Sequence, residues 1–234
     1  MYILNIAQLK PCDIFLTKGP NKKIRKAIQL ATGGNFSHVA MYLGYSSFIE
    51  ADLYGVHTGN PQRLNFEDEG DIIVRRSKNE LDVSRFEKIC FHVKQRTAAP
   101  YSILNAILSI TKAEGADEPG KHFCSQLISE GFRQVGIDVN STKETVKITP
   151  ADFEFSPEFV TVSGVLEELS DEDAAGYLSS INKFDLPSFQ QNATNTLMKQ
   201  LKKILGEYGY NPDTVHPQNS IGTEINIILS KFQV

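Results

Sequence analysis

Cysteine is scarce in this sequence, with three residues among 234, at positions 12, 90 and 124, and basic charge is not in excess. The odd number of cysteines, without a Cys-x-x-Cys pair or clustered Cys/His spacing, argues against a disulfide framework and against a structural zinc site. The net charge of −4 gives the molecule no overall basic field. We therefore expect no nucleic-acid partner.

Long apolar runs are also missing. No window approaches about 18 uninterrupted apolar residues, so we expect no transmembrane segment. The first residues, MYILNIAQLKPCDIFL, lack the charged start, continuous apolar stretch and cleavage site of a signal peptide. We therefore expect the protein to be cytoplasmic in the cell that makes it, unless a specialised secretion system exports it without a cleavable signal.

Basic residues gather in one short stretch, KGPNKKIRKAIQL, which contains Lys18, Lys22, Lys23, Arg25 and Lys26. Such charge runs usually form a solvated loop and the first turn of a helix. Contact with an anionic substrate or with a membrane surface is the alternative.

Apolar runs and turn residues predict an α+β fold with an antiparallel sheet in the middle of the chain, packed against helices. The pattern predicts helices over 22–31, 101–111 and 124–136, and strands over 12–19, 37–44, 46–59, 70–77, 87–95 and 159–165.

A change of composition after about residue 166, first acidic and then helical, divides the chain into a main domain, 1–166, and a C-terminal extension, 167–234. An apolar stripe at helical spacing in the extension must cover apolar surface. We expect it to pack on the main domain, with a partner protein or a membrane surface as the alternative. Its residues are Leu197, Leu201, Ile204 and Leu205.

Two segments contain the side chains of a candidate cysteine nucleophile and its base. KHFCSQLISEGF places Cys124 at the start of an amphipathic helix, and NFSHVAMYLG places His38 in an apolar strand. Unpaired backbone N–H groups and the helix dipole stabilise a thiolate at a helix N-terminus, and a facing imidazole can take its proton. A histidine in a strand is also often a hydrogen-bonded structural residue.

An acidic third member is expected on the next strand. Antiparallel pairing would bring Glu50 towards His38, where a carboxylate fixes the imidazole tautomer. Asp52 shares that strand face and competes for the same role. Backbone N–H groups near Cys124 are expected to stabilise an oxyanion.

Other candidates have weaker claims. Cys12 and Cys90 fall inside predicted strands, as expected of buried apolar fillers. His122 lies two residues before Cys124 and is a rival base or a substrate contact, or simply exposed.

Five segments occur in an order that resembles the YiiX/YebB-like cysteine hydrolases, a circularly permuted branch of the NlpC-type, papain-like superfamily. They are CDIFLTKG, FSHVAMYLG, FIEADLYGV, FCSQLISEGF and ITPADFEFSPEF, and the similarity covers about residues 10–162. The resemblance implies a permuted papain-like fold with a catalytic His38, Glu50 and Cys124.

The resemblance also implies substrate-side roles for two residues and shows one departure. Tyr101 matches an aromatic residue near the cleft and would orient substrate through its hydroxyl, with a core position as the alternative. Asp13 would cap or orient a loop facing the site. The opening turn of the family reads Pro-Gly-Asp-Ile, whereas this chain has Cys12 in place of the glycine and loses its freedom at positive φ.

These features together predict a cysteine hydrolase that cleaves an amide bond through an acyl-enzyme, without a metal or organic cofactor. The family resemblance makes a peptidoglycan stem peptide the leading substrate. Action as an exported antibacterial effector, with an immunity or secretion partner, would reconcile the missing signal peptide with a cell-wall target. The alternatives are a lipid-directed acyl hydrolase or acyltransferase, and a non-catalytic interaction module in which Cys124 is only a core residue.

Overall fold

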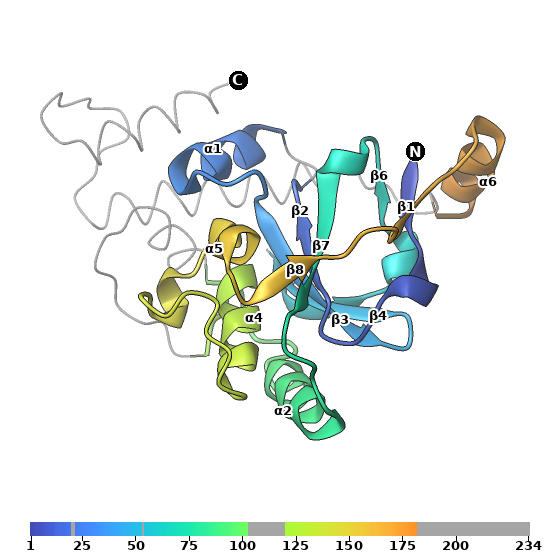
Figure 1. Ribbon diagram of the computed structural model, residues 1–234. Coiled ribbons are helices and arrows are strands. Elements are labelled where there is room, and N and C mark those ends of the chain that lie inside the picture. The colour runs from blue at the N-terminus through green and yellow to red at the C-terminus, as the bar shows by residue number, and fades with distance from the viewer. Residues whose placement is uncertain (20–21, 53, 103–119, 182–234) are drawn as a thin grey trace, which may run out of the picture.

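The computed structural model describes residues 1–19, 22–52, 54–102 and 120–181 and has a mixed α+β architecture with antiparallel sheets packed against helices (Figure 1). The larger sheet has six strands in the order β5-β4-β3-β2-β7-β8. Their bounds in that order are Gly55–Gly59, Ser47–Asp52, His38–Gly44, Ile14–Thr17, Ile72–Ser77 and Phe159–Thr161.

A smaller sheet has the order β6-β1-β9, formed by Asn65–Phe66, Tyr2–Leu4 and Leu166–Glu168. The α-helices in the described ranges are α1 (Lys22–Thr32), α2 (Val83–Lys94), α4 (Cys124–Arg133), α5 (Pro150–Phe155) and α6 (Asp171–Ile181). Short 3-10 turns cover Ile6–Gln8, Pro61–Arg63, Glu69–Asp71 and Thr145–Lys147.

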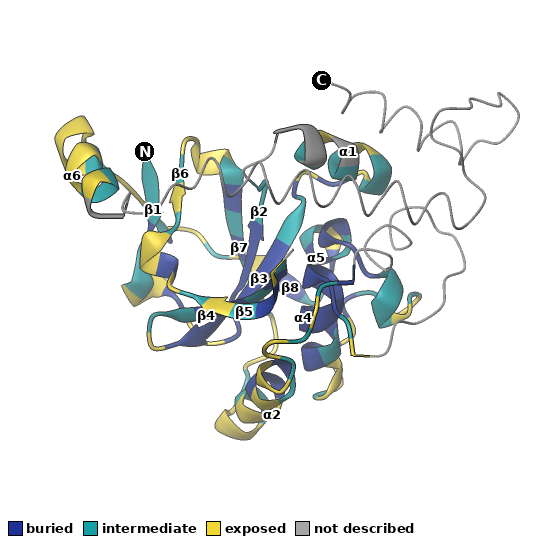
Figure 2. Cartoon of the chain, turned by 180° about the vertical axis from the view of Figure 1, so that it is seen from behind, coloured by how far each residue is buried: buried dark blue, intermediate teal, exposed yellow. Residues whose placement is uncertain are grey.

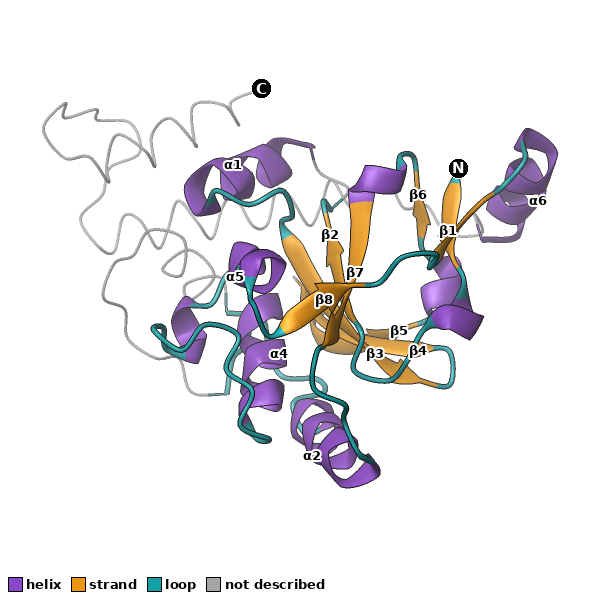
Figure 3. Cartoon of the chain, in the orientation of Figure 1, coloured by secondary structure: helices purple, strands orange, loops and turns teal. Residues whose placement is uncertain are grey.

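Apolar side chains on both faces of the central strands form two hydrophobic cores, one on each face of the larger sheet. Ile14 and Leu16 of β2 belong to the core that includes residues of α2 and α4, whereas Phe15 between them belongs to the core shared with the smaller sheet. Successive side chains of a strand point to opposite faces, which explains this division. Figure 3 shows α4 and α5 on one side of the strands and β1 with β6 on the other.

Helix α4 is the most deeply buried of these helices. Leu127, Ile128 and Phe132 have no exposed surface, and the helix packs against β3, β4 and α2. Figure 2 shows α4 largely buried while the outer side of α2 faces solvent. The sequence prediction of a helix starting at the thiol is confirmed, since α4 begins at Cys124.

The strand predicted over 87–95 is wrong, because residues 87–94 lie in helix α2 and residue 95 is its C-cap. Ile89 and Val93, four residues apart, share the buried face with Cys90, whereas Phe91 is 65% exposed. The apolar pattern at Ile89, Phe91 and Val93 is also compatible with a helix, in which Ile89 and Val93 share the buried face and Phe91 points to solvent. Asp82 starts the helix by accepting a hydrogen bond from the backbone N–H of Arg85.

The expected boundary between 166 and 167 falls inside β9. Glu167 and Glu168 pair with Ile3 and Tyr2 of β1, so the first residues of the extension belong to the smaller sheet. Helix α6 follows. The predicted helix over 101–111 lies outside the described residues except for its first two positions, and the apolar stripe over 197–205 lies wholly outside them.

No helix in the described part of the chain is both long and apolar enough to cross a membrane.

Gly55 lets the chain after α2 lie against the edge strand β5. It has a φ of +94°, and a Cβ atom there would lie 2.5 Å from the carbonyl oxygen of Ala99. Two backbone hydrogen bonds join Val56 to this segment, one to Ala99 and one from Ala98. Because Tyr101 lies only two residues after Ala99, the contact helps to position one of the candidate site residues.

Gly55→Ala is expected to destabilise the fold more than Gly136→Ala. Both positions have positive φ, which costs roughly 1–2 kcal/mol for alanine. Only Gly55 adds a backbone clash, since nothing lies within 4 Å of a Cβ at Gly136. We expect about 1–3 kcal/mol more loss in the free energy of unfolding at Gly55, measured by urea denaturation. Equal losses would contradict the role given to this contact.

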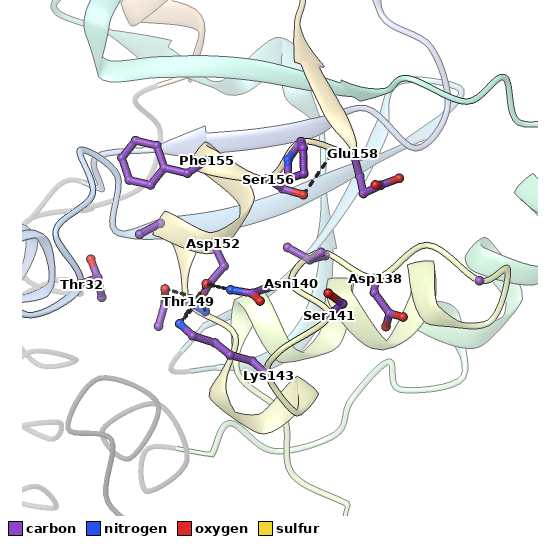
Figure 4. A pocket seen from close by; sticks show the side chains of 14 residues that line it. Thr32, Asp138, Asn140, Ser141, Lys143, Thr149, Asp152, Phe155, Ser156 and Glu158 are labelled. Carbon is purple, nitrogen blue, oxygen red and sulfur yellow. Dashed lines mark hydrogen bonds and ion pairs between the residues drawn. The ribbon is translucent and has the colours of Figure 1, made fainter.

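Asp152 ties the start of α5 to the segment that follows α4 (Figure 4). Its carboxylate accepts hydrogen bonds from the Asn140 amide at 2.8 Å, the Lys143 ammonium at 2.9 Å, and the backbone N–H and hydroxyl of Thr149, each at 2.8 Å. Burial alone would raise the pKa of Asp152, but these donors together lower it. The carboxylate is therefore held ionised in the folded protein.

Asp152→Asn is expected to cost about 2–3 kcal/mol of folding free energy near pH 7, because charge-assisted hydrogen bonds are lost. The folded pKa of Asp152 lies below its unfolded value, so its contribution is present above about pH 4 and is lost as the pH falls through the folded pKa. Urea denaturation at several pH values should show the wild-type advantage shrinking in acid. The control is Asp138→Asn, which breaks a half-exposed pair with Arg133 and should cost under about 1 kcal/mol.

Candidate active site

His38 and Glu50 form the shortest contact of the candidate site. His38 is the first residue of β3, and Glu50 lies in β4 opposite Ala40, two residues further along β3. Both side chains therefore lie on the same sheet face. The Nε2 atom of His38 lies 2.6 Å from Oε2 of Glu50. The carboxylate occupies Nε2, which leaves Nδ1 of the ring for another partner.

The Cys124 thiol is the second partner of the imidazole. A side-chain hydrogen bond links Cys124 and His38, and backbone N–H groups of Val39 and Ser125 also contact the sulfur. Ser125 fixes the helix start, since its buried hydroxyl donates to the carbonyl of Ile148 at 2.6 Å. The N-cap residue, Phe123, provides no side-chain hydrogen bond, so no capping side chain competes with the sulfur for the backbone N–H of Ser125.

Opposing effects set the ionisation of this pair. Burial alone would raise the pKa of Cys124, but His38 and the two backbone N–H groups together lower it. Burial alone would lower the pKa of His38, but Cys124 and Glu50 raise it well above its usual value. These two shifts favour a thiolate beside an imidazolium at neutral pH, the charge state of an activated cysteine nucleophile.

Tyr101 lies close to the thiol. Burial, followed by the charges of Cys124 and Asp52, raises the pKa of the Tyr101 hydroxyl well above its usual value. The hydroxyl therefore stays protonated and can donate a hydrogen bond at neutral pH. Its ring packs against the core under α4, so the position combines the core and site roles that the sequence left open.

Tyr101→Phe keeps the packed ring and removes the hydrogen-bond donor. If the hydroxyl orients an acyl substrate, acylation by an activity-based acyl probe should slow by about tenfold, the equivalent of one hydrogen bond. Alkylation of the thiol by iodoacetamide should keep its rate, because that reagent does not use the hydroxyl. Equal acylation rates in wild type and variant would assign Tyr101 to packing alone.

Asp52, the competitor of Glu50, has a different partner. Its Oδ1 atom lies 3.1 Å from Nε2 of His57 and accepts the backbone N–H of Tyr54 at 2.8 Å. The structure thus brings Glu50 and not Asp52 into hydrogen-bond contact with His38.

Asp13 lies away from these residues. It is fully buried, and its carboxylate accepts hydrogen bonds from the Arg76 guanidinium at 2.6 and 2.7 Å. His38 pairs with Thr17, four residues along β2 from Asp13, which is roughly 13 Å at the rise of a strand. The carboxylate also accepts the backbone N–H of Lys10 at 2.8 Å and so caps the turn before β2, but the structure does not bring Asp13 to the thiol.

His122 faces another direction. It is 8% exposed, and its Nδ1 atom lies 3.6 Å from a carboxylate oxygen of Glu130, one turn and a half into α4. His92 of α2 approaches the same carboxylate at 3.6 Å. The position of a base beside Cys124 is occupied by His38.

The two other cysteines do not lie inside strands, so that expectation is wrong. Cys12 lies in the turn before β2 with a φ of +68°, and Cys90 lies in α2. Their thiols are joined by a hydrogen bond, which together with burial raises the pKa of Cys12. Both are buried core residues, as expected. The turn does adopt the left-handed conformation that glycine would favour.

His57 is the residue of this region that the sequence analysis missed. It lies on β5 directly opposite Glu50, with Nε2 3.7 Å from Glu50 Oε1. In the sequence, His57 is a polar residue in the second half of the stretch 46–59, which we predicted as strand. The structure divides this stretch into two paired strands, β4 and β5.

Comparisons with known proteins show a distant structural likeness and no match in sequence. No family model matches the chain, and no curated protein matches it. Among solved structures, a crystal structure of the metalloprotein YiiX from Escherichia coli O157:H7 is similar, with 18% sequence identity and a TM-score of 0.49. The match covers 67% of this chain and 97% of that one.

Proposed function

We propose that this protein is a cysteine hydrolase of the amidase or peptidase type, with a circularly permuted papain-like fold. In this proposal Cys124 is the nucleophile, His38 the general base and acid, and Glu50 the residue that orients His38. The observation that carries the proposal is the imidazole of His38 held between the Cys124 thiol and the Glu50 carboxylate. A thiol that served only as a core filler would need neither partner.

The reaction would proceed through an acyl-enzyme. The Cys124 thiolate attacks the carbonyl carbon, and backbone N–H groups at the start of α4 stabilise the oxyanion. The imidazolium of His38 then gives its proton to the leaving amine. Water, deprotonated by His38, attacks the thioester and releases the acid. The proposed chemistry uses no metal or organic cofactor.

The substrate proposed is an amide bond of a peptidoglycan stem peptide, met by the protein as an exported antibacterial effector. This part rests on the sequence resemblance. The lipid-directed alternative rests on the family resemblance and, in part, on the basic stretch, of which two members, Lys18 and Arg25, lie 3.2 and 4.0 Å from Asp71. Asp71 therefore compensates part of the charge that an anionic headgroup would meet.

An activity-based thiol probe followed by a substrate screen tests the proposal. The full chain and its Cys124→Ala variant would be incubated with peptidoglycan fragments and, separately, with N-acyl lipids and acyl esters, and the products identified by mass spectrometry. The proposal expects cleavage of an amide in the fragments by the wild type only. Cleavage confined to the lipids would favour the lipid-directed alternative, and a thiol that resists the probe would favour an interaction module.

A further inference from the structure

Three metal-ligating side chains gather on one face of the β4–β5 hairpin. Ile49 and Ala51 of β4 belong to the core that includes α4, so Glu50 and Asp52 point to the opposite face. His57 pairs directly with Glu50 across the hairpin and therefore shares that face. One donor atom from each of Glu50, Asp52 and His57 lies within 4.8 Å of the other two.

The imidazole of His57 is directed at both carboxylates. Its Nε2 atom lies 3.1 Å from Asp52 Oδ1 and 3.7 Å from Glu50 Oε1. This nitrogen is buried and is paired with Asp52 Oδ1, a contact that a metal ion bound between the two atoms would replace. The ring also makes a backbone hydrogen bond with Thr58. A histidine that ligates a metal is commonly held in this way, with a backbone group fixing the ring while the other nitrogen faces the ion.

Glu50 can serve this cluster and His38 at once, because its two oxygens face different partners. Oε2 contacts His38 at 2.6 Å, whereas Oε1 is the oxygen near His57. A cation bound through Oε1 would leave the contact with His38 in place. The cluster is thus separate from the thiol, although it shares one carboxylate with the candidate triad.

We propose that Glu50 Oε1, Asp52 Oδ1 and His57 Nε2 form a binding site for a divalent transition-metal ion. Imidazole favours transition ions over Mg²⁺ and Ca²⁺, and the carboxylates supply two negative charges. With metal–ligand bonds of about 2.1 Å, the 3.1 and 3.7 Å separations correspond to ligand–metal–ligand angles of about 95° and 125°, within the range around tetrahedral geometry. Three protein ligands leave at least one position for water. The proposal does not depend on the proposed hydrolase function.

Titration with Co²⁺ tests the site, with the full chain in a Cys124→Ser background so that no thiolate competes near His38. Calorimetry measures the affinity, and the visible absorption of Co²⁺ reports whether its ligands are nitrogen and oxygen or sulfur. His57→Ala and the isosteric Asp52→Asn remove one ligand each. His92→Ala is the matched control, because His92 also faces a carboxylate, that of Glu130, but lies on α2.

The proposal expects one Co²⁺ per chain with a spectrum free of sulfur ligation, and affinity at least tenfold weaker in both ligand variants but unchanged in the control. Circular dichroism of the metal-free proteins checks that the variants fold, and Asp52→Asn keeps the test valid if His57→Ala does not. Absence of saturable binding, equal affinity in the folded ligand variants, or loss confined to His92→Ala would each overturn it. Because the protein used has no Cys124 thiol, none of these outcomes depends on whether the chain is a hydrolase.

Discussion

Cys124→Ala should abolish turnover, by roughly five to six orders of magnitude if the thiol is the nucleophile, while the fold remains intact. Alanine is close to cysteine in size and favours the helix that begins at this residue. We therefore expect a change in the free energy of unfolding below about 1.5 kcal/mol. Turnover of the substrate found in the screen and urea denaturation of both proteins measure the two effects.

Alkylation of the wild-type protein shows whether the reactivity of the Cys124 thiol comes from its ionisation or from its exposure to solvent. Cys12, Cys90 and Cys124 have similar exposures of 2%, 4% and 6%, so differences in their rates report ionisation rather than accessibility. The hydrogen bond between Cys12 and Cys90 lowers the pKa of Cys90 and raises that of Cys12, so Cys12 is the unactivated reference. Because His38 and backbone N–H groups lower the pKa of Cys124, its alkylation should persist at pH values below the usual thiol pKa of about 8.5. His38→Ala should shift the pH dependence of Cys124 alkylation to higher pH. Equal labelling of the three cysteines in the folded protein would rule out the assignment.

Glu50→Gln is expected to give the second largest loss, on the order of 10⁴-fold in turnover with stability nearly unchanged. The amide keeps the shape of the side chain but removes the charge that stabilises the imidazolium and permits the wrong tautomer of His38. Since Glu50 contributes to the raised pKa of His38, the variant should also lose thiolate at neutral pH. Turnover and the pH profile of alkylation are the two measurements.

Asp52→Asn is the matched control for Glu50→Gln. Asp52 lies two residues along the same strand and contacts His57 instead of His38, so its amide variant should lose less than about tenfold in turnover. A larger loss for Asp52→Asn than for Glu50→Gln would transfer the orienting role to Asp52.

The site contacts that sequence analysis anticipated are those fixed by local periodicity. A helix start at Cys124 follows from the spacing of apolar residues after it, and the His38–Glu50 contact follows from alternation in two neighbouring strands. In both cases a short stretch of chain contains the whole pattern.

The features that were missed depend on tertiary packing. The segment 87–95 reads equally well as a strand until the burial of Ile89, Cys90 and Val93 selects the helix. The position of Asp13 is set by Arg76, whose strand, β7, pairs with β2 from the other side. His57 reaches Glu50 only through the β4–β5 register, which sequence alone does not specify.

The separation of the candidate triad along the chain has a consequence for refolding. His38 and Glu50 lie in one hairpin, a local contact that loop-closure entropy allows to form early, whereas Cys124 comes from far along the chain. The thiol meets the imidazole only when Leu127 and Ile128 have docked α4 against the sheet. In a chain that has collapsed without this docking, Cys124 therefore has the pKa of an ordinary thiol. During refolding, the time at which Cys124 becomes reactive at low pH would measure when α4 docks.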